Sequence, residues 1–358
     1  MSANQMMASG IVEIAGRAIG AGQPPYIVAE ISGNHNGDIG RALAIIEAAA
    51  EAGADAVKLQ TYTADTLTID CDKPDFLIES GLWAGRKLYD LYQEAHTPWN
   101  WHERLFEKGA DLGMAVFSTP FDPTALAFLK DLNAPAYKIA SFEAVDSPLV
   151  RQIAAAGKPV VISTGMANLG EIAEVVEAAR SVGVKDLILL HCISSYPAPV
   201  EDSNLETLPH LAQTFDVIVG LSDHTLGTVV SVAAVAMGAC FIEKHFTLSR
   251  DDGGPDAAFS LEPDELSTLV RDCYLAWQAR GRIDYSRKPS ETQNLIFRRS
   301  LYAVSDISEG EHFSDRNIRS IRPGYGLTPK FLPDVLGRKA ARAIERGTPL
   351  DWTMVAVG

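Results

Sequence analysis

Short apolar runs alternate with longer segments of helical period along most of the chain. The first run is YIVAE at 26–30, and apolar residues in the following segment, 39–53, recur at the spacing of an amphipathic helix. The same alternation predicts seven further strands, at 56–60, 114–119, 136–140, 159–164, 186–191, 217–222 and 240–245. Eight β-then-α units over about 250 residues predict an α/β fold of the (β/α)8 TIM-barrel type. A doubly wound sheet is the alternative, but it seldom needs eight such units.

Three segments fall outside this repeat. IVEIAGRAIG at 11–20 is typical of a small hairpin, which could close the bottom of the barrel. The insertion 61–98 is rich in Asp, Tyr and Trp and has the length of an active-site cover. After residue 281 the helical pattern breaks into a polar stretch, followed by short β runs and turns. We therefore predict a barrel domain at 1–281, a linker at 282–296 and a small β-rich domain at 297–358.

Composition and charge narrow the class of protein. Hydrophobic residues make up 47% and charged residues 22%, the balance of an ordinary globular protein. The net charge of -15 argues against a nucleic-acid partner, because phosphate binding needs a basic surface. The four cysteines are widely spaced and indicate neither a zinc knuckle nor a disulfide framework. Since no apolar run approaches the length of a membrane span and no secretion signal stands at the start, we expect a cytoplasmic protein.

Polar or ionisable side chains stand at the ends of all eight predicted strands. In barrel enzymes the chemistry lies at the carboxyl ends of the strands. A carboxylate at the end of a buried strand, such as Glu30, also costs free energy unless a partner is present. A single such residue would indicate a structural ion pair, but eight polar ends together predict an enzyme. They include Glu30, Lys58, Thr119, Lys138, Ser163, His191, Asp223 and His245.

Two histidines suggest a metal site. His224 and His245 fall at equivalent heights on neighbouring strands, whose backbones lie about 4.8 Å apart, with Asp223 and Glu243 beside them. Each imidazole could instead satisfy a local hydrogen bond. Two nitrogen ligands are too few for a closed tetrahedral zinc site. An octahedral ion such as Mn2+, completed by water and substrate oxygens, is therefore favoured.

Two strand lysines predict an anion-binding pocket. Such a cationic, hydroxyl-rich pocket suits a small phosphate or carboxylate. One lysine could instead merely neutralise Glu30 or Glu143. A Schiff-base aldolase is a rival interpretation, because a strand lysine could be the nucleophile. The pocket would be formed by Lys58 and Lys138 with Thr119, Ser141 and Ser163.

Seven motifs resemble, in this order, those of the sialic acid synthase family: AEISGNHNGDIGRALAIIEAAAEAGADAVKLQT, FSTPFD, AYKIASFE, STGMA, LHCISSYPAP, GLSDHT and FIEKHFT. Residues 301–358 resemble the family's antifreeze-like (SAF) domain. The resemblance implies condensation of phosphoenolpyruvate with an N-acetylated amino sugar aldehyde, giving phosphate and a nine-carbon 2-keto acid. It also implies a divalent metal, preferably Mn2+ with Mg2+ or Co2+ as alternatives. The implied assembly is a domain-swapped homodimer, in which the small domain of one chain covers the barrel of the other.

Carried over by position, the resemblance implies roles for individual residues. Glu30 would bind metal-bound water or a sugar hydroxyl, and Glu143 would assist proton transfer. His224 and His245 would hold the metal. Arg322 would reach the sugar bound by the partner chain, although a surface arginine that stabilises its turn is the alternative. Phosphoenolpyruvate would be held by Lys58, Thr119, Lys138, Ser141, Ser163, Ser194 and Ser222, and the sugar site would be lined by Tyr196 and Asp256.

Two stretches bear on the identity of the sugar. Sialic and legionaminic acid synthases usually carry a GPDH-like stretch after the second metal histidine, whereas this chain has GPDA, with Ala257 in place of the histidine. The segment 71–99, most of which belongs to the insertion, resembles the corresponding segment of pseudaminic acid synthases. Its aromatic residues would suit a 6-deoxy sugar with two acetamido groups, although most of them could simply pack the insertion against the barrel.

We therefore expect 2,4-diacetamido-2,4,6-trideoxy-L-altrose as the sugar. The alternative within the family is an N-acetylneuraminate or legionaminate synthase. The alternative of another class is a carbohydrate-binding protein built on an inactive barrel.

Overall fold

The structure, a computed structural model, describes residues 10–357. The described chain divides into two compact units, one ending at Arg282 and one beginning at Ile283. The polar stretch expected as a linker falls at the start of the second unit and contains the 3-10 helix Pro289–Phe297.

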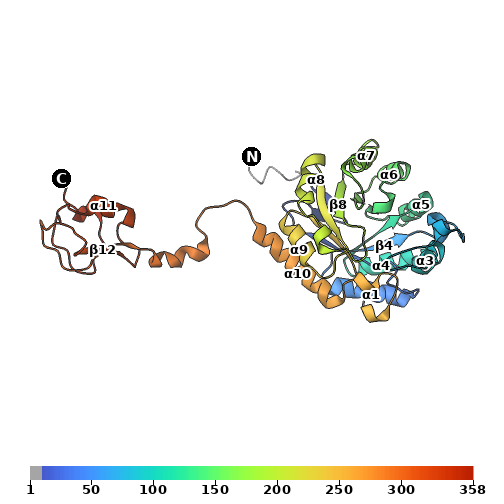
Figure 1. Cartoon of the computed structure of the whole chain (residues 1–358), viewed down its shortest axis with the longest axis horizontal. Coiled ribbons are helices and arrows are strands. Elements are labelled where there is room, and N and C mark those ends of the chain that lie inside the picture. The colour runs from blue at the N-terminus through green and yellow to red at the C-terminus, as the bar shows by residue number, and fades with distance from the viewer. Residues whose placement is uncertain (1–9, 358) are drawn as a thin grey trace. The chain divides into compact units, whose positions relative to one another are not determined.

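The first unit is a closed barrel of eight parallel strands with helices around the outside (Figure 1). Each strand is hydrogen-bonded to the next in chain order, and the last closes onto the first. The TIM-barrel prediction is thus confirmed, and every predicted strand end lies within one residue of the observed end. The strands are β3 (Tyr26–Glu30), β4 (Ala56–Thr61), β5 (Ala115–Pro120), β6 (Tyr137–Ile139), β7 (Val160–Ser163), β8 (Leu187–Cys192), β9 (Ile218–Asp223) and β10 (Phe241–His245).

Helices follow the strands, and several begin at a polar cap. The Asp38 carboxylate accepts hydrogen bonds from the first backbone N–H groups of α1 (Ile39–Glu51), and the Asn168 side-chain oxygen does the same for α7 (Leu169–Arg180). Two short helices, α2 (Ala64–Leu67) and α3 (Leu88–Ala95), belong to the insertion between β4 and β5. The helices around the barrel are α1 (Ile39–Glu51), α4 (His102–Asp111), α5 (Pro123–Asp131), α6 (Ser147–Ala154), α7 (Leu169–Arg180), α8 (Thr207–Phe215), α9 (Val229–Ala236) and α10 (Pro263–Arg280).

The amino-terminal half of the barrel interior is sealed by apolar side chains. Alternate strand residues, among them Tyr26, Val28 and Phe241, form one buried cluster there. The hairpin β1 (Val12–Ile14) and β2 (Arg17–Ile19) contributes three apolar side chains to the same cluster and so closes this end, as predicted. Polar groups that face the interior can therefore be reached only from the carboxyl ends of the strands.

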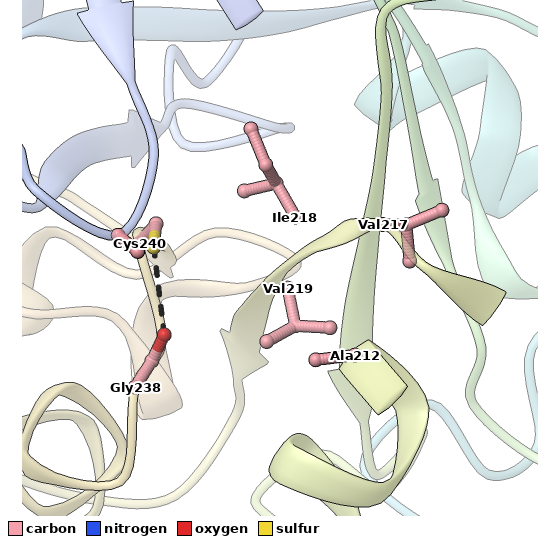
Figure 2. Close-up of a pocket in the computed structure, with 7 residues that line it drawn as sticks. Ala212, Val217, Ile218, Val219, Gly238 and Cys240 are labelled. Carbon is pink, nitrogen blue, oxygen red and sulfur yellow. Dashed lines mark hydrogen bonds between the residues drawn. The ribbon is translucent and has the colours of Figure 1, made fainter. Parts of the chain in front are cut away.

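A small apolar pocket lies near the amino-terminal ends of β9 and β10 (Figure 2). It has only about 10 Å³ of space, near the lower limit for a single water molecule. The Cys240 thiol there donates to the backbone carbonyl of Gly238 at 3.5 Å, so the sulfur has a local partner. This pocket is at the wrong end of the barrel for the predicted chemistry. It is lined by Ala21, Ala212, Val217, Ile218, Val219, Gly238 and Cys240.

The second unit is small and has its own apolar core, which includes Leu301, Phe313, Val335 and Leu350. Its regular elements are an antiparallel pair, β11 (Ser300–Ala303) and β12 (Ile318–Ile321), and a short helix, α11 (Leu332–Val335). Across residues 10–357, no helix combines the length and the apolar character needed to cross a membrane.

Candidate active site

Strand alternation decides which polar side chains enter the barrel. Glu30 is in phase with the interior residues Tyr26 and Val28, and Lys58 pairs beside it on β4. His245 pairs with Glu30 on the other side. By the same alternation the interior also receives Thr119, Lys138, Ser163, Ser222 and Glu243. The predicted site residues on the barrel strands therefore lie together inside the barrel, at the carboxyl ends of the strands.

Two lysines and two carboxylates occupy the centre of this site. The Lys58 ammonium lies 2.5 Å from Glu30 Oε2 and 3.7 Å from Glu243 Oε1. Burial works against the charge of Lys58, but the carboxylates of Glu243 and Glu30 outweigh it and raise the pKa of the lysine. Burial raises the pKa of Glu30, against the influence of Lys58. The two charges therefore depend on each other.

Lys138 differs from Lys58 in its balance of charges. Its ammonium lies 3.6 Å from Glu243 Oε1, and burial lowers its pKa because Glu243 offsets the burial only in part. Glu243 in turn has a lowered pKa, since the two lysines outweigh its burial. A bound anion would supply the negative charge that Lys138 lacks.

Hydroxyl groups surround the lysines. Thr119 Oγ1 lies 3.4 Å from the Lys58 ammonium, and the Ser222 hydroxyl donates to Glu243 Oε1 at 3.3 Å. The buried Ser163 hydroxyl has no hydrogen-bond partner within residues 10–357. Buried hydroxyls are normally paired, so Ser163 is suited to receive a ligand oxygen.

Gly165 brings three strand ends together. Its backbone N–H donates to Ser141 Oγ at 3.1 Å, and a Cβ atom added at this position would overlap both Ser141 Oγ and Ser194 Oγ. Ser141 follows β6, Gly165 follows β7 and Ser194 follows β8. The glycine therefore allows the hydroxyls predicted to hold phosphoenolpyruvate to converge.

The two predicted metal ligands are neighbours. The ring centroids of His224 and His245 lie 5.4 Å apart. His224 Nδ1 donates to the carbonyl of Ile193 at 2.8 Å, which leaves Nε2 free to bind an ion. The buried His245 Nδ1 lacks a hydrogen-bond partner among the described residues and lies 4.0 Å from Asp256 Oδ2. Burial holds the pKa of His245 well below its ordinary range, so this imidazole is neutral, as a metal ligand must be.

These histidines fit an ion that completes its coordination with other ligands. Within residues 10–357, no group of three or more His, Cys, Asp or Glu side chains is arranged to hold a metal. The fit rests on the neutral, unpartnered His245 beside His224. Two imidazoles alone favour an open site over a closed zinc site.

A chain of hydrogen bonds links the strand-end glutamate to the predicted sugar site. The Gln60 amide donates to Glu30 Oε1 and to Ser32 Oγ, at 3.0 Å in both cases, and the Ser32 hydroxyl donates to Asp256. The sequence analysis assigned roles to neither Gln60 nor Ser32. The pattern carries no signal for this link, because Ser32 and Asp256 are 224 positions apart.

The loop SGNHNG at 32–37 turns sharply after β3. Ser32, Asn36 and Gly37 adopt positive φ angles of 49°, 50° and 72°. The Asn34 amide donates to the Phe246 carbonyl at 2.9 Å and to Ser260 Oγ at 2.8 Å, which holds the loop against the chain that follows β10. The chain therefore turns tightly here, and Ser32 takes one of the left-handed positions although it is not a glycine.

Glu143 lies just beyond β6 in a partly buried position. Burial raises its pKa to about 7, against a hydrogen bond within its own turn and the charge of Lys138. Its Oε2 atom has no hydrogen-bond partner among the described residues. A carboxyl group with a pKa near neutrality suits proton transfer.

Some polar strand ends point away from the interior. Asp223 pairs with Lys244 at 2.8 Å and accepts from the hydroxyls of Thr225 and Ser231. His191 is hydrogen-bonded through Nε2 to the carbonyl of Ser203 at 2.7 Å. These groups stabilise the layer between strands and helices. The expectation that Asp223 stands beside the metal is therefore wrong, because its side chain is already satisfied on the outer face.

The remaining predicted residues lie in loops. Tyr196 lies in the loop after β8, and its ring centroid is 4.3 Å from that of His224. Phe259 packs on His245 with a centroid distance of 4.8 Å, a contact that sequence reasoning missed. Arg322 lies in the second unit, where its side chain is exposed.

Cationic, hydroxyl and imidazole groups that converge at the open end of a parallel barrel define an enzyme that acts on small anionic substrates. Residues 45–285 match the NeuB family, and residues 298–356 match the SAF domain. The chain therefore belongs to the NeuB family, which confirms the predicted family resemblance and its small C-terminal SAF domain.

Relatives extend over nearly the whole chain. A pseudaminic acid synthase from Campylobacter jejuni is 46% identical over 327 residues, which cover 91% of this chain and 95% of that one. A pseudaminic acid synthase from Helicobacter pylori is 41% identical over 329 residues, with coverages of 92% and 97%. A solved structure of N-acetylneuraminic acid synthetase from Leptospira borgpetersenii, in complex with citrate, has a TM-score of 0.72 at 31% identity, with coverages of 80% and 95%.

Proposed function

We propose that this chain is a cytoplasmic, phosphoenolpyruvate-dependent pseudaminic acid synthase. It would condense phosphoenolpyruvate with 2,4-diacetamido-2,4,6-trideoxy-L-altrose and water, giving pseudaminic acid and phosphate. The observation that carries the proposal is the grouping of Lys58 and Lys138 with His224 and His245 at one end of the barrel. The choice of sugar is supported by the 46% and 41% identity to pseudaminic acid synthases, against 31% to the N-acetylneuraminic acid synthetase.

The lysines would hold the anionic substrate. Lys58 and Lys138 bind the phosphate and carboxylate oxygens, and fixed cations in a buried site stabilise such charge strongly. Hydroxyl and backbone N–H groups complete the cradle, with Gly165 keeping space for them. The hydroxyls would be those of Thr119, Ser141, Ser163, Ser194 and Ser222.

The sugar would bind in the part of the site next to the two histidines. His224 and His245 would hold a divalent cation, preferably Mn2+, whose chemistry when bound is that of a Lewis acid for the sugar aldehyde. Tyr196 and Asp256 would line this part of the site. Carbon 3 of the enol then attacks the aldehyde carbon, water adds to carbon 2, and phosphate leaves by C–O cleavage.

Two carboxyl groups would orient the water molecule and transfer its proton. Glu30, fixed between Lys58 and Gln60, would orient water or a sugar hydroxyl. Glu143, with a pKa raised to about 7, would accept or return a proton near neutral pH.

A homodimer with exchanged small domains is part of this proposal. Apolar side chains that are at least 50% exposed follow strands β6 to β9 at the open end of the barrel, and such patches indicate an interface. Residues 283–358 contain 12 of the chain's 31 basic residues and 9 of its 46 acidic residues. The second unit is therefore basic and the first is acidic. Attraction between unlike units would favour docking, with Arg322 reaching the sugar. The exposed side chains are Phe142, Val145, Met166, Leu169, Val200, Leu226 and Val229.

One observation favours the rival Schiff-base chemistry. The lowered pKa of Lys138 is a property that a nucleophilic lysine needs. Reduction with borohydride in the presence of pyruvate distinguishes the two mechanisms. We expect no covalent adduct on Lys138 or Lys58, and an adduct would refute the phosphoenolpyruvate mechanism.

The test of the proposed function is phosphate release from phosphoenolpyruvate by the purified protein with Mn2+. The trideoxy altrose sugar and N-acetylmannosamine are compared at equal concentration. Release with the first sugar is expected to be far faster than any release with N-acetylmannosamine. Release with N-acetylmannosamine alone would retain the family chemistry and reject the sugar, whereas no release with any acetamido sugar would favour an inactive binding barrel.

A further inference from the structure

One aromatic residue of the insertion reaches the site. Trp83 lies in a short loop that backbone hydrogen bonds between Ile78 and Arg86, and between Gly85 and Ile78, close on itself. Its neighbours Leu82 and Ala84 are exposed, whereas the Trp83 side chain is half-buried. The loop therefore directs Trp83 toward the barrel.

Two contacts hold Trp83 over the sugar side. Its indole N–H donates to the carbonyl of Pro255 at 2.8 Å, next to Asp256 in the chain. Its ring lies against Tyr196 with centroids 5.5 Å apart, and Tyr196 in turn lies against His224. With Phe259 packed on His245, aromatic rings form a wall beside the two histidines.

Three other aromatic residues of the segment 71–99 have structural partners. Trp99 stacks on Phe128 with centroids 4.9 Å apart, and its indole N–H donates to the Tyr62 carbonyl. Tyr92 also packs on Tyr62, and the Tyr89 hydroxyl donates to Asp65. These residues fix the insertion, so Trp83 is distinguished by its contact with Tyr196.

We propose that Trp83 is a specificity-determining residue that presents its apolar ring to the deoxygenated carbon 6 of the sugar. The inference rests on the proposed function and deepens it. A methyl group against an indole is favourable, whereas a hydroxyl at the same place would lose hydrogen bonds to water. The indole N–H is already bonded to Pro255 and cannot compensate. Trp83 therefore selects the trideoxy sugar over N-acetylmannosamine.

The test measures kcat/KM for both sugars in wild type, Trp83→Ala, Trp83→Phe and the control Trp99→Phe. Trp83→Ala should lower kcat/KM for the trideoxy sugar about tenfold or more, which is the usual effect of a lost apolar contact. The loss of kcat/KM for N-acetylmannosamine should be smaller. The KM for phosphoenolpyruvate should not change. Trp83→Phe, which keeps an apolar ring, should retain most of the preference. Equal losses for both sugars, or an unchanged preference in Trp83→Ala, would overturn the role of Trp83.

A second measurement uses the wild-type protein and needs no variant to fold. Hydroxyl-radical oxidation followed by mass spectrometry should show protection of Trp83 by the trideoxy sugar with phosphoenolpyruvate, and none of Trp277 on the outer helix α10. Absence of protection at Trp83 would refute the contact. A wild type that does not use the trideoxy sugar would instead refute the proposed function, so the two failures are distinguishable.

Discussion

The Lys58 ammonium lies 2.5 Å from Glu30 Oε2, and neither side chain is more than 4% exposed. Forming a buried ion pair costs free energy because both charges lose their contact with water. Removing one partner costs more, because the remaining charge is then buried and unpaired. This relationship explains how a glutamate can end the buried strand YIVAE.

Glu30→Gln should therefore destabilise the fold by about 3 kcal/mol, since Lys58 keeps only the more distant Glu243 as a partner. Turnover should also fall steeply. The matched control is Glu47→Gln, which removes the surface partner of Lys108, and a surface pair contributes less than about 1 kcal/mol. Denaturant unfolding of both variants gives the comparison. Similar small losses in the two variants would show that the buried pair has no special importance.

The histidine pair gives a prediction about metal binding. His245→Ala should bind Mn2+ much more weakly and lose at least about 100-fold in turnover, because one of two protein ligands is gone. His210→Ala, on the exposed face of α8, is the control and should behave as wild type. Metal content by mass spectrometry and unfolding temperature should be measured on the same samples. Full metal content and activity in His245→Ala would contradict the assignment.

The strands were predictable because parallel strands are buried on both faces and read as continuous apolar runs. The same property hides the direction of each side chain. Asp223 and Ser222 are adjacent and both buried, yet Asp223 pairs with Lys244 outside the barrel while Ser222 bonds to Glu243 inside it. A strand with alternating polarity would have shown this difference.

Long-range contacts could not be predicted from the pattern either. The hydrogen bond between Ser32 and Asp256 joins two loops, and loops have no periodicity that would align them. The same holds for Trp83 and Tyr196, whose contact depends on how an insertion folds back. Sequence reasoning could name aromatic residues in the insertion but could not tell which one faces the site.

Glu143 gives a prediction about pH. Burial raises its pKa from 4.5 to about 7, so between these values the folded state binds a proton that the unfolded state has lost. The folded state is therefore destabilised by this group as the pH rises from about 4.5 to 7. The amide introduced by Glu143→Gln cannot ionise, so the variant escapes this loss. Its free energy of unfolding minus that of wild type should therefore be up to about 3 kcal/mol larger at pH 8 than at pH 4.

Glu143→Gln should also remove the pH dependence of kcat/KM near pH 7. Wild-type kcat/KM should change with an apparent pKa near 7, and this inflection should be absent in Glu143→Gln. Unfolding and kinetic series at pH 4 to 9 provide both readouts. An unchanged inflection in the variant would assign the titration to another group.

Gly165 gives a steric prediction. Gly165→Ala should raise the KM for phosphoenolpyruvate about tenfold or more, because the added Cβ overlaps Ser141 Oγ and Ser194 Oγ and forces apart the hydroxyls at the anion site. Gly22→Ala is the control, since no atom lies within 4 Å of the added Cβ there. Steady-state kinetics with saturating sugar separates KM from kcat. An unchanged KM in Gly165→Ala would place the substrate away from these serines.

Exchange of small domains can be tested by mixing two inactive variants. If Arg322 serves the barrel of the partner chain, His245→Ala and Arg322→Ala should each be nearly inactive alone. In a mixed dimer, the barrel with intact His245 receives intact Arg322 from its partner, so one site of two is restored. Random reassembly of equal amounts should then recover about a quarter of wild-type activity. If each small domain served its own barrel, both mixed sites would be defective and no activity would return. Light scattering must show that the variants and wild type have the same mass, because a monomer would rule out the exchange directly.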